Sequence, residues 1–164
     1  MKTILIKLAI VIFVSTLFIS CSTEDDGIYF NEITESKITY SPIENEILDL
    51  INEYRKEQGL TTLSKLNLIS SVAKTHTSYM VEVGEVNHDN FPERHEQLVH
   101  NAKAISVGEN VAYGYSSSES VVKAWLNSPG HKKIIEDETF THFGISTEKD
   151  ANGRNYFTHI FINK

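Results

Sequence analysis

The stretch GENVAYGYSSSESVVKAWLNSPGH, from Gly108 to His131, decides how this chain folds. Its first residues predict a tight turn leading into a short strand, and the helix that follows carries Trp125, a core residue. Glu109 and His131 bracket that helix, so a carboxylate and an imidazole stand on either side of one packed element. If the fold brings these two groups together, they can share a proton or a metal ion.

Capping residues within this stretch predict where its two helices begin. Ser116 and Glu119 have the spacing of a capping box, in which each side chain satisfies a backbone amide of the other residue. Ser128 and Pro129 begin a second short helix, with serine as the cap and proline at the first helical position. His131 lies in the first turn of that helix, where the macrodipole disfavours its charged form.

Three further helices are predicted upstream. A helix over 41–58 starts with a Ser-Pro-Ile-Glu capping box and ends before a glycine. A second helix, over 67–84, has an apolar stripe that includes His76, which we interpret as a core residue. A short helix over 92–101 follows an irregular segment containing His88. That histidine is in a loop, where functional side chains are common, and is the natural third member of the site.

The C-terminal part predicts an antiparallel hairpin. Strand patterns over 140–147 and 156–162 flank a polar turn over 149–153. His142 and His159 lie on these strands. Which face of the hairpin each histidine occupies depends on the register, which the pattern leaves open.

Residues 1–20 predict a secretory signal peptide, because Lys2 and Lys7 precede an apolar run from Leu8 to Leu17. That run is shorter than the roughly 20 apolar residues of a membrane span, and we expect no transmembrane helix in the mature protein. Cys21 is the only cysteine, so no intrachain disulfide can form. Its place after a small residue at the end of the apolar run resembles the bacterial lipobox, in which the cysteine is lipidated.

A lipid on Cys21 would anchor the exported protein to a bacterial membrane. The alternative is a chance cysteine at an ordinary cleavage site. Residues 21–40 are polar and acidic, which is typical of a tether. The acidic cluster after Cys21 also resembles the surface-export signal of some lipoproteins. A solvated linker explains it equally well, so cell-surface exposure stays an open alternative to a periplasmic location.

The charge of the chain disfavours two classes of partner. Without Lys2 and Lys7, 13 basic residues stand against 22 acidic ones, a formal charge of −9. Nucleic acid is not expected as a partner, because its binding needs clustered Lys and Arg and no such cluster stands out. The same balance argues against docking on anionic lipid headgroups, so membrane attachment is expected to depend on Cys21.

The motifs of the C-terminal part carry a family resemblance. In order, they are Gly108-Glu109-Asn110-Val111-Ala112, Trp125, Ser128-Pro129-Gly130-His131, Phe143-Gly144-Ile145 and Tyr156-Phe157-Thr158. Together they resemble the bacterial branch of the CAP superfamily (cysteine-rich secretory, venom antigen and pathogenesis-related proteins), also called the SCP domain. The resemblance implies an α+β fold over residues 41–164, an α-β-α sandwich with a small antiparallel sheet between helical layers.

Eukaryotic members of that family carry a cleft with two His and two Glu residues. His88 matches the first His and Glu109 the first Glu, whereas Ser128 and Tyr156 stand where the second Glu and second His would fall. Bacterial relatives share these departures, and His131 of the Ser-Pro-Gly-His motif is expected to replace the missing imidazole. The resemblance places three further residues along the cleft: Asn110, Ser128 and Tyr156.

Two interpretations of His88, Glu109 and His131 follow. Two imidazoles and a carboxylate suit zinc or another divalent cation and leave a position open for water. The alternative, which we favour, is a hydrogen-bonded His–Glu pair that supports the cleft. We expect a binding module for an unknown small-molecule, lipid or envelope ligand. The rivals are a metal-dependent hydrolase with these three residues catalytic and Glu109 as general base, and a structural surface lipoprotein.

Overall fold

The computed structural model describes residues 38–164, so the expected signal peptide and the lipid on Cys21 lie outside the described residues. The helices are α1 (Pro42–Glu57), α2 (Asn67–Val83), α3 (Phe91–Ala102), α4 (Ser118–Asn127) and α5 (Pro129–Ile135). The strands are β1 (Ser64–Lys65), β2 (Ser106–Tyr113), β3 (His142–Lys149) and β4 (Asn155–Asn163). Within residues 38–164, every helix is too short or too polar to cross a membrane.

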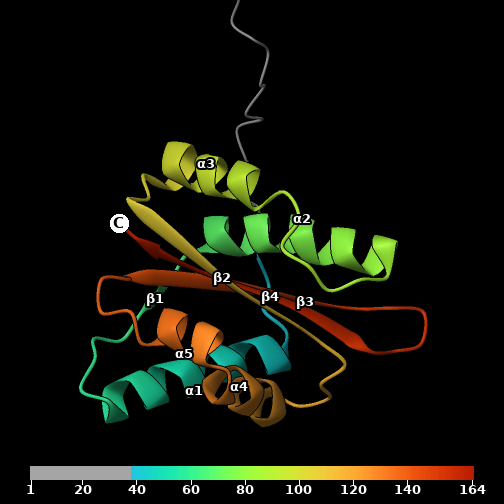
Figure 1. The fold of residues 1–164 in the computed structure, drawn as a ribbon, viewed down its shortest axis with the longest axis horizontal. Coiled ribbons are helices and arrows are strands. Elements are labelled where there is room, and N and C mark those ends of the chain that lie inside the picture. Colours follow the sequence, from blue (N-terminus) through green and yellow to red (C-terminus); the bar gives the residue numbers. More distant parts are fainter. Residues whose placement is uncertain (1–37) are drawn as a thin grey trace, which may run out of the picture.

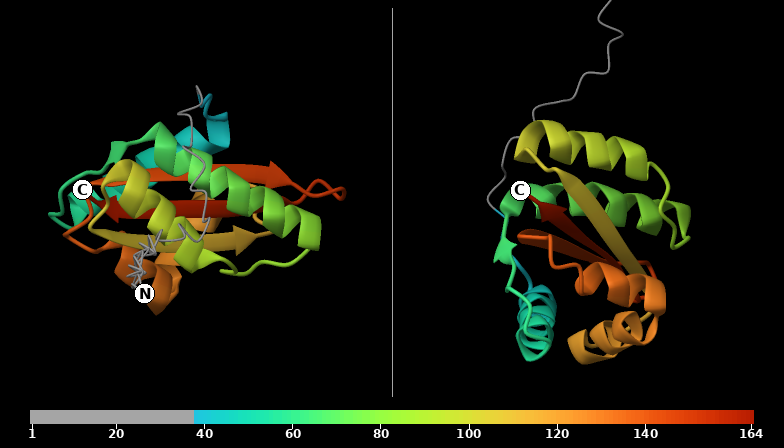
Figure 2. Two further views of the ribbon diagram at one scale, coloured as in Figure 1. Left: turned by 90° about the horizontal axis from the view of Figure 1, so that it is seen from above. Right: turned by 60° about the vertical axis from the view of Figure 1, so that its left-hand side comes forward.

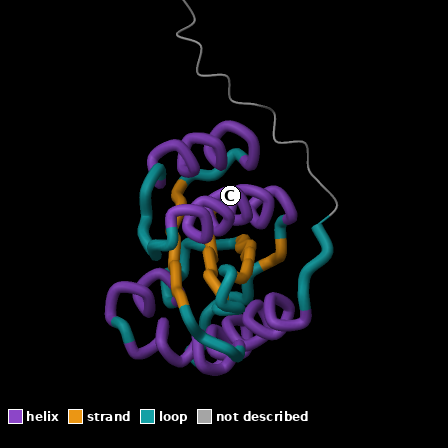
Figure 3. Tube along the Cα trace, turned by 90° about the vertical axis from the view of Figure 1, so that its right-hand side faces the viewer, coloured by secondary structure: helices purple, strands orange, loops and turns teal. Residues whose placement is uncertain are grey.

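The strands form one sheet between two layers of helices, so the predicted α-β-α sandwich is confirmed. The strand order is β1-β3-β4-β2, with α2 and α3 on one face and α1, α4 and α5 on the other (Figures 1 and 3). β1 pairs in parallel with β3, whereas β3 and β2 each pair antiparallel with β4. The sheet is therefore mixed rather than purely antiparallel. β1 has two residues, too few to show a strand pattern in the sequence.

Each face of the sheet has its own apolar core. On the α1, α4 and α5 side, Trp125 packs edge-on against Phe157, with ring centroids 6.4 Å apart. On the α2 and α3 side, Ile69 and Val72 of α2 pack with Leu98 of α3. The alternation of β2 and β4 feeds side chains into both cores, and this fixes which face each polar residue of β2 can reach.

The predicted helix starts are confirmed at α1 and shifted by one residue at α4. Ser41 forms the expected capping box with Glu44. At α4 the capping box is Ser117 with Ser120, not Ser116 with Glu119. Serine can fill either role in such a box, and a run of serines leaves the choice to the surrounding packing. Ser128 is the N-cap of α5, but its side chain makes no capping hydrogen bond.

The predicted turn at Gly108 is wrong, because β2 runs through it without a break. Gly108 is needed for space. A Cβ atom there would lie 3.0 Å from Cγ2 of Ile134 and 3.0 Å from Cζ of Phe140. The glycine therefore lets α5 and the segment before β3 approach β2 closely.

Candidate functional site

Glu109 is the centre of a buried polar cluster beside β2. Its Oε1 accepts hydrogen bonds from Nδ1 of His88 at 2.8 Å and from Nη2 of Arg94 at 2.7 Å. Its Oε2 accepts a hydrogen bond from Nε of Arg94, also at 2.7 Å. The side chains of Glu109 and Arg94 are 1% and 5% exposed, whereas that of His88 is 51% exposed. A buried bidentate ion pair thus holds an imidazole that faces outward.

The hydrogen bonds and charges around Glu109 determine its protonation state. Burial alone would raise the pKa of Glu109, but hydrogen bonds from His88 and Arg94 and the positive charge of Arg94 outweigh it, and the pKa is lowered. Glu109 is therefore an anion at neutral pH. An ionised carboxylate only accepts hydrogen bonds, so Nδ1 of His88 carries the hydrogen. The other ring nitrogen, Nε2, is left to face a ligand or solvent.

Arg94 is the residue of this cluster that sequence reasoning missed. It comes from the first half of α3, and its Nη1 donates to the carbonyl oxygen of Asp89 at 2.6 Å. Arg94 therefore ties the loop that carries His88 to the strand that carries Glu109. Charge balance could have indicated it, because a carboxylate on a buried strand needs a nearby positive charge. Arg94 of α3 supplies that charge.

His131 makes no hydrogen bond or ion pair with the cluster in the part of the chain that the structure describes. Successive side chains of β2 point to opposite faces, so Glu109 faces α3 while Asn110 faces α5. Nδ2 of Asn110 donates to the backbone carbonyl oxygen of His131 at 3.2 Å, and Nδ1 of His131 is buried with no hydrogen-bond partner among residues 38–164. Burial first, and then the charge of His88, lowers the pKa of His131. Of the three predicted residues, His88 and Glu109 are joined by a hydrogen bond, and His131 shares no hydrogen bond with either within residues 38–164.

The donor set does not fit a metal ion. A zinc site built from protein side chains needs three or four ligands. Residues 38–164 contain no group of three or more His, Cys, Asp or Glu side chains placed to hold one. Both oxygens of Glu109 already accept hydrogen bonds from Arg94, whose guanidinium stands where a cation would have to bind. The favoured alternative, a His–Glu pair that supports the site, matches the geometry.

A cavity of about 470 Å³ opens beside the cluster. It lies along the first half of β2, between the start of α3 and the end of α5. The residues that line it are His88, Phe91, Ser106, Val107, Gly108, Glu109, Lys133, Ile134, Asp137 and Phe140. This size is within the range of ordinary small-ligand pockets, and its walls are mostly apolar with a few polar groups.

The three residues expected along the cleft do not line this cavity. Asn110 is fully buried, Tyr156 is 2% exposed and packs with Met80, and Ser128 lies at the junction of α4 and α5. His76 is buried with Nε2 bonded to the carbonyl oxygen of Asn87, as expected for a core residue. The motif residues that line the cavity are His88, Gly108 and Glu109, and its apolar wall comes from Phe91, Ile134 and Phe140, which carry no motif.

The layer order and the His–Glu pair beside β2 define an α-β-α sandwich of the SCP type. An extracellular protein containing an SCP domain from Bacillus anthracis is similar in structure, with TM-score 0.65 and 28% identity over 77% of this chain and 45% of that one. An outer surface protein from Borrelia burgdorferi shares the fold, with TM-score 0.66 and 24% identity over 73% of this chain and 91% of that one.

The chain belongs to the cysteine-rich secretory protein (CAP) family, whose model matches residues 48–161. The protein YkwD from Bacillus subtilis is 31% identical over 137 residues, which is 82% of this chain and 52% of YkwD. The chain therefore spans about half the length of this relative. The family fixes the fold, and the chemistry of the site must be argued from its own residues.

Proposed function

We propose that this CAP domain is an extracytoplasmic binding module whose ligand enters the cavity beside β2 and contacts His88. One observation carries the proposal: a half-exposed imidazole is fixed by a buried Glu109–Arg94 ion pair at the wall of a 470 Å³ cavity. A side chain held in one orientation by buried partners loses little entropy when it binds a ligand.

Binding is favoured over hydrolysis by the state of Glu109. A general base works best with a pKa near the working pH, whereas the pKa of Glu109 is lowered by its bonds to His88 and Arg94 against the effect of burial. Both of its oxygens are already engaged by donors. The carboxylate is therefore arranged to orient His88 rather than to accept a proton from water.

Spectroscopic screening tests the binding proposal. Small carboxylates, amphiphiles and short peptides would be added to ¹⁵N-labelled protein, and the amide shifts of the cavity residues would be followed. We expect at least one class to shift Val107, Glu109 and Ile134. Its affinity should fall about tenfold or more in His88→Ala, which removes one oriented hydrogen-bonding group, and stay unchanged in the matched surface variant His100→Ala. A screen in which no probe moves these amides would contradict the proposal.

The proposal extends to export and to attachment through a lipid on Cys21. It is supported by the apolar run before that cysteine and by the similar Bacillus anthracis protein, which is extracellular. Fractionation of cells making the full chain tests it. The wild type should sediment with membranes, and Cys21→Ser should appear in the soluble exported fraction. Identical distributions of the two proteins would refute the anchor.

A further inference from the structure

The pairing of β2 with β4 determines which backbone groups of β2 point away from the sheet. Gly114 donates its N–H to the carbonyl oxygen of Asn155 at 2.8 Å, and the two residues stand opposite each other when the register is continued by one pair. Backbone direction alternates along an antiparallel strand, so the even-numbered residues of β2 bond to β4. The N–H and C=O groups of the odd-numbered residues, Val107 and Glu109 among them, therefore point outward.

β2 is an edge strand, and part of its outward edge is open. Figure 2, seen from above, shows β2 along one side of the sheet. The carbonyl oxygen of Val111 accepts a hydrogen bond from Nε1 of Trp125 at 3.1 Å, which closes that position. Within residues 38–164, the outward backbone groups of Val107 and Glu109 have no hydrogen-bond partner.

These open backbone groups belong to the cavity. Val107, Gly108 and Glu109 line it. Glu109 keeps 5% of its surface exposed although its side chain keeps 1%, so the open part of this residue is mainly backbone. A row of unpaired N–H and C=O groups on an edge strand is a template for another extended chain. The complementary ligand is therefore a peptide in β conformation.

The side chains around the open edge indicate which peptide fits. Alternate side chains of an added strand would face the two helical layers. On one side stands Phe91 of α3, a half-buried aromatic ring. On the other side stands Lys133 of α5. Of the charged residues that line the cavity, His88 and Glu109 are paired, and Oδ1 of Asp137 bonds to Thr139.

Lys133 is left without a hydrogen-bond or ion-pair partner in the part of the chain that the structure describes. Its neighbour Lys132 has Glu136 at 3.5 Å. An acidic side chain in the ligand would complement Lys133. This local positive charge persists although the chain as a whole is acidic.

We propose that the cavity binds an extended peptide segment of another protein, which adds a strand to β2 at Val107 and Glu109. The segment places an apolar side chain against Phe91 and an acidic side chain beside Lys133. The inference rests on the proposed function, since it names the ligand class of the same cavity. A second copy of this chain fits less well. Its own β2 is recessed between helical layers and would bring a second Lys133 against the first.

The probe is the pentapeptide Val-Glu-Val-Glu-Val, acetylated and amidated at its ends, added to the ¹⁵N-labelled domain. We expect slower amide exchange at Val107 and Glu109 and unchanged exchange at Gly108, whose amide already bonds to β4. N-methylation of the peptide at alternate positions should weaken binding about tenfold or more, and at the intervening positions should leave it unchanged. Equal effects at all positions, or unshifted Val107 and Glu109 amides, overturn the added strand.

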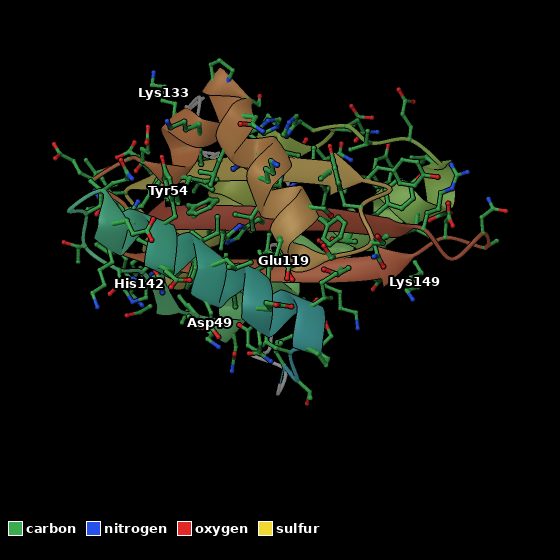
Figure 4. The ribbon with its side chains drawn as sticks, turned by 90° about the horizontal axis from the view of Figure 1, so that it is seen from below. Asp49, Tyr54, Glu119, Lys133, His142 and Lys149 are labelled. Carbon is green, nitrogen blue, oxygen red and sulfur yellow. The ribbon has the colours of Figure 1, made fainter. Side chains whose placement is uncertain are left out.

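Variants of the protein give a second reading. Val107→Pro removes one outward N–H, which an edge strand tolerates, and should abolish peptide binding while the circular dichroism spectrum stays native. Lys133→Gln should lower the affinity for the Glu peptide to that of its Gln counterpart. Lys149→Gln, at the other end of the molecule (Figure 4), should leave it unchanged. If Val107→Pro does not fold, the N-methylated peptides carry the test.

The outcomes separate the two proposals. If small molecules shift the cavity amides but no peptide does, the strand inference fails and the binding module stands. If neither does, both fail. A dimer that protects Val107 and Glu109 without added peptide would identify a second copy as the occupant and overturn the peptide proposal.

Discussion

The two edges of the sheet are finished in different ways. On the β3 side, β1 pairs with the first residues, and side chains take the next outward amides. The amide of Ile145 donates to Oγ of Ser70 at 3.0 Å, and that of Thr147 donates to Oε1 of Glu44 at 2.7 Å. On the β2 side, the outward groups of Val107 and Glu109 face a cavity. Edge strands invite unwanted pairing, so an edge left open is a candidate for a functional one.

A buried glutamate stands at each edge, and the two do opposite things. Glu44 uses both oxygens on neutral donors, the amide of Thr147 and the amide and hydroxyl of Ser41, and so closes the backbone of its edge. Both oxygens of Glu109 accept hydrogen bonds from Arg94 and His88, and its outward backbone N–H and C=O groups are left without a partner within residues 38–164. Glu44 therefore satisfies an outward backbone amide of β3, whereas the side chain of Glu109 leaves the outward backbone groups of β2 unbonded.

The largest effect is expected at the open edge, from Arg94→Met. This change leaves the buried carboxylate of Glu109 without its countercharge and should cost about 3–5 kcal/mol of unfolding free energy. Urea unfolding measures it, with the exposed variant Arg154→Met as the control. Adding Glu109→Gln to Arg94→Met should recover part of the loss. A cost below about 1 kcal/mol would mean that the ion pair does not hold this edge together.

A smaller loss of unfolding free energy is expected at the β3 edge. Glu44→Gln turns one acceptor oxygen into an NH₂ group that faces donors, and we expect a loss of about 1–3 kcal/mol. The same urea titration applies, with Asp49→Asn as the matched control on the exposed face of α1 (Figure 4). The amide of Thr147 should exchange faster in this variant. Unchanged exchange there would show that Glu44 does not cap β3.

At acid pH, the free energy of unfolding should depend on His159, which lies on β4 in the middle of the sheet. His159 is fully buried, and burial lowers its pKa from 6.5 to about 3. Because the folded pKa is depressed, stability is full above the unfolded pKa and is lost as the pH falls from about 6.5 towards 3. A neutral ring in place of the imidazole, as in His159→Phe, should remove about 1.4 kcal/mol per pH unit from that slope. If the unfolding free energy of the wild type and of His159→Phe fell equally with pH, His159 would not cause the loss of stability at acid pH.

The smallest stability effect is expected from His88→Ala. The ring is half exposed, and Oε1 of Glu109 keeps its bond to Arg94, so the cost should be under about 1 kcal/mol. Ligand affinity should nevertheless fall, which distinguishes a binding residue from a structural one. A thermal melt beside the screening titration measures both quantities. A large loss of stability would make His88 part of the scaffold.

Local signals predicted most of the fold. The Ser41 capping box, the glycine after α2 and the hairpin of β3 and β4 depend on neighbouring residues, and all are confirmed. The turn predicted at Gly108 was wrong because the reason for this glycine is non-local, a close approach to Ile134 and Phe140. A glycine that serves packing has the same sequence appearance as one that serves a turn.

The sequence predicts only part of the site, because local motifs show some of its residues and others depend on contacts between distant segments. His88 and Glu109 meet as the motif resemblance implied. Arg94 carries no motif, and its role appears only when the burial of Glu109 is known. The sequence groups His131 with them because Glu109 and His131 bracket one helix and because the resemblance puts His131 in place of a missing imidazole. Because β2 is a continuous strand, Glu109 and Asn110 point to opposite faces, and Asn110 is the residue that donates a hydrogen bond to the backbone carbonyl oxygen of His131.

Native-state hydrogen exchange of four amides distinguishes an open β2 edge from a closed β3 edge. The amides of Ile145 and Thr147 are bonded to side chains, and those of Val107 and Glu109 point into the cavity. We predict slow exchange for the first two and fast exchange for the second two, although all four lie in one sheet. Comparable protection of all four would mean that the β2 edge is closed, and would contradict the binding of an added strand at this cavity.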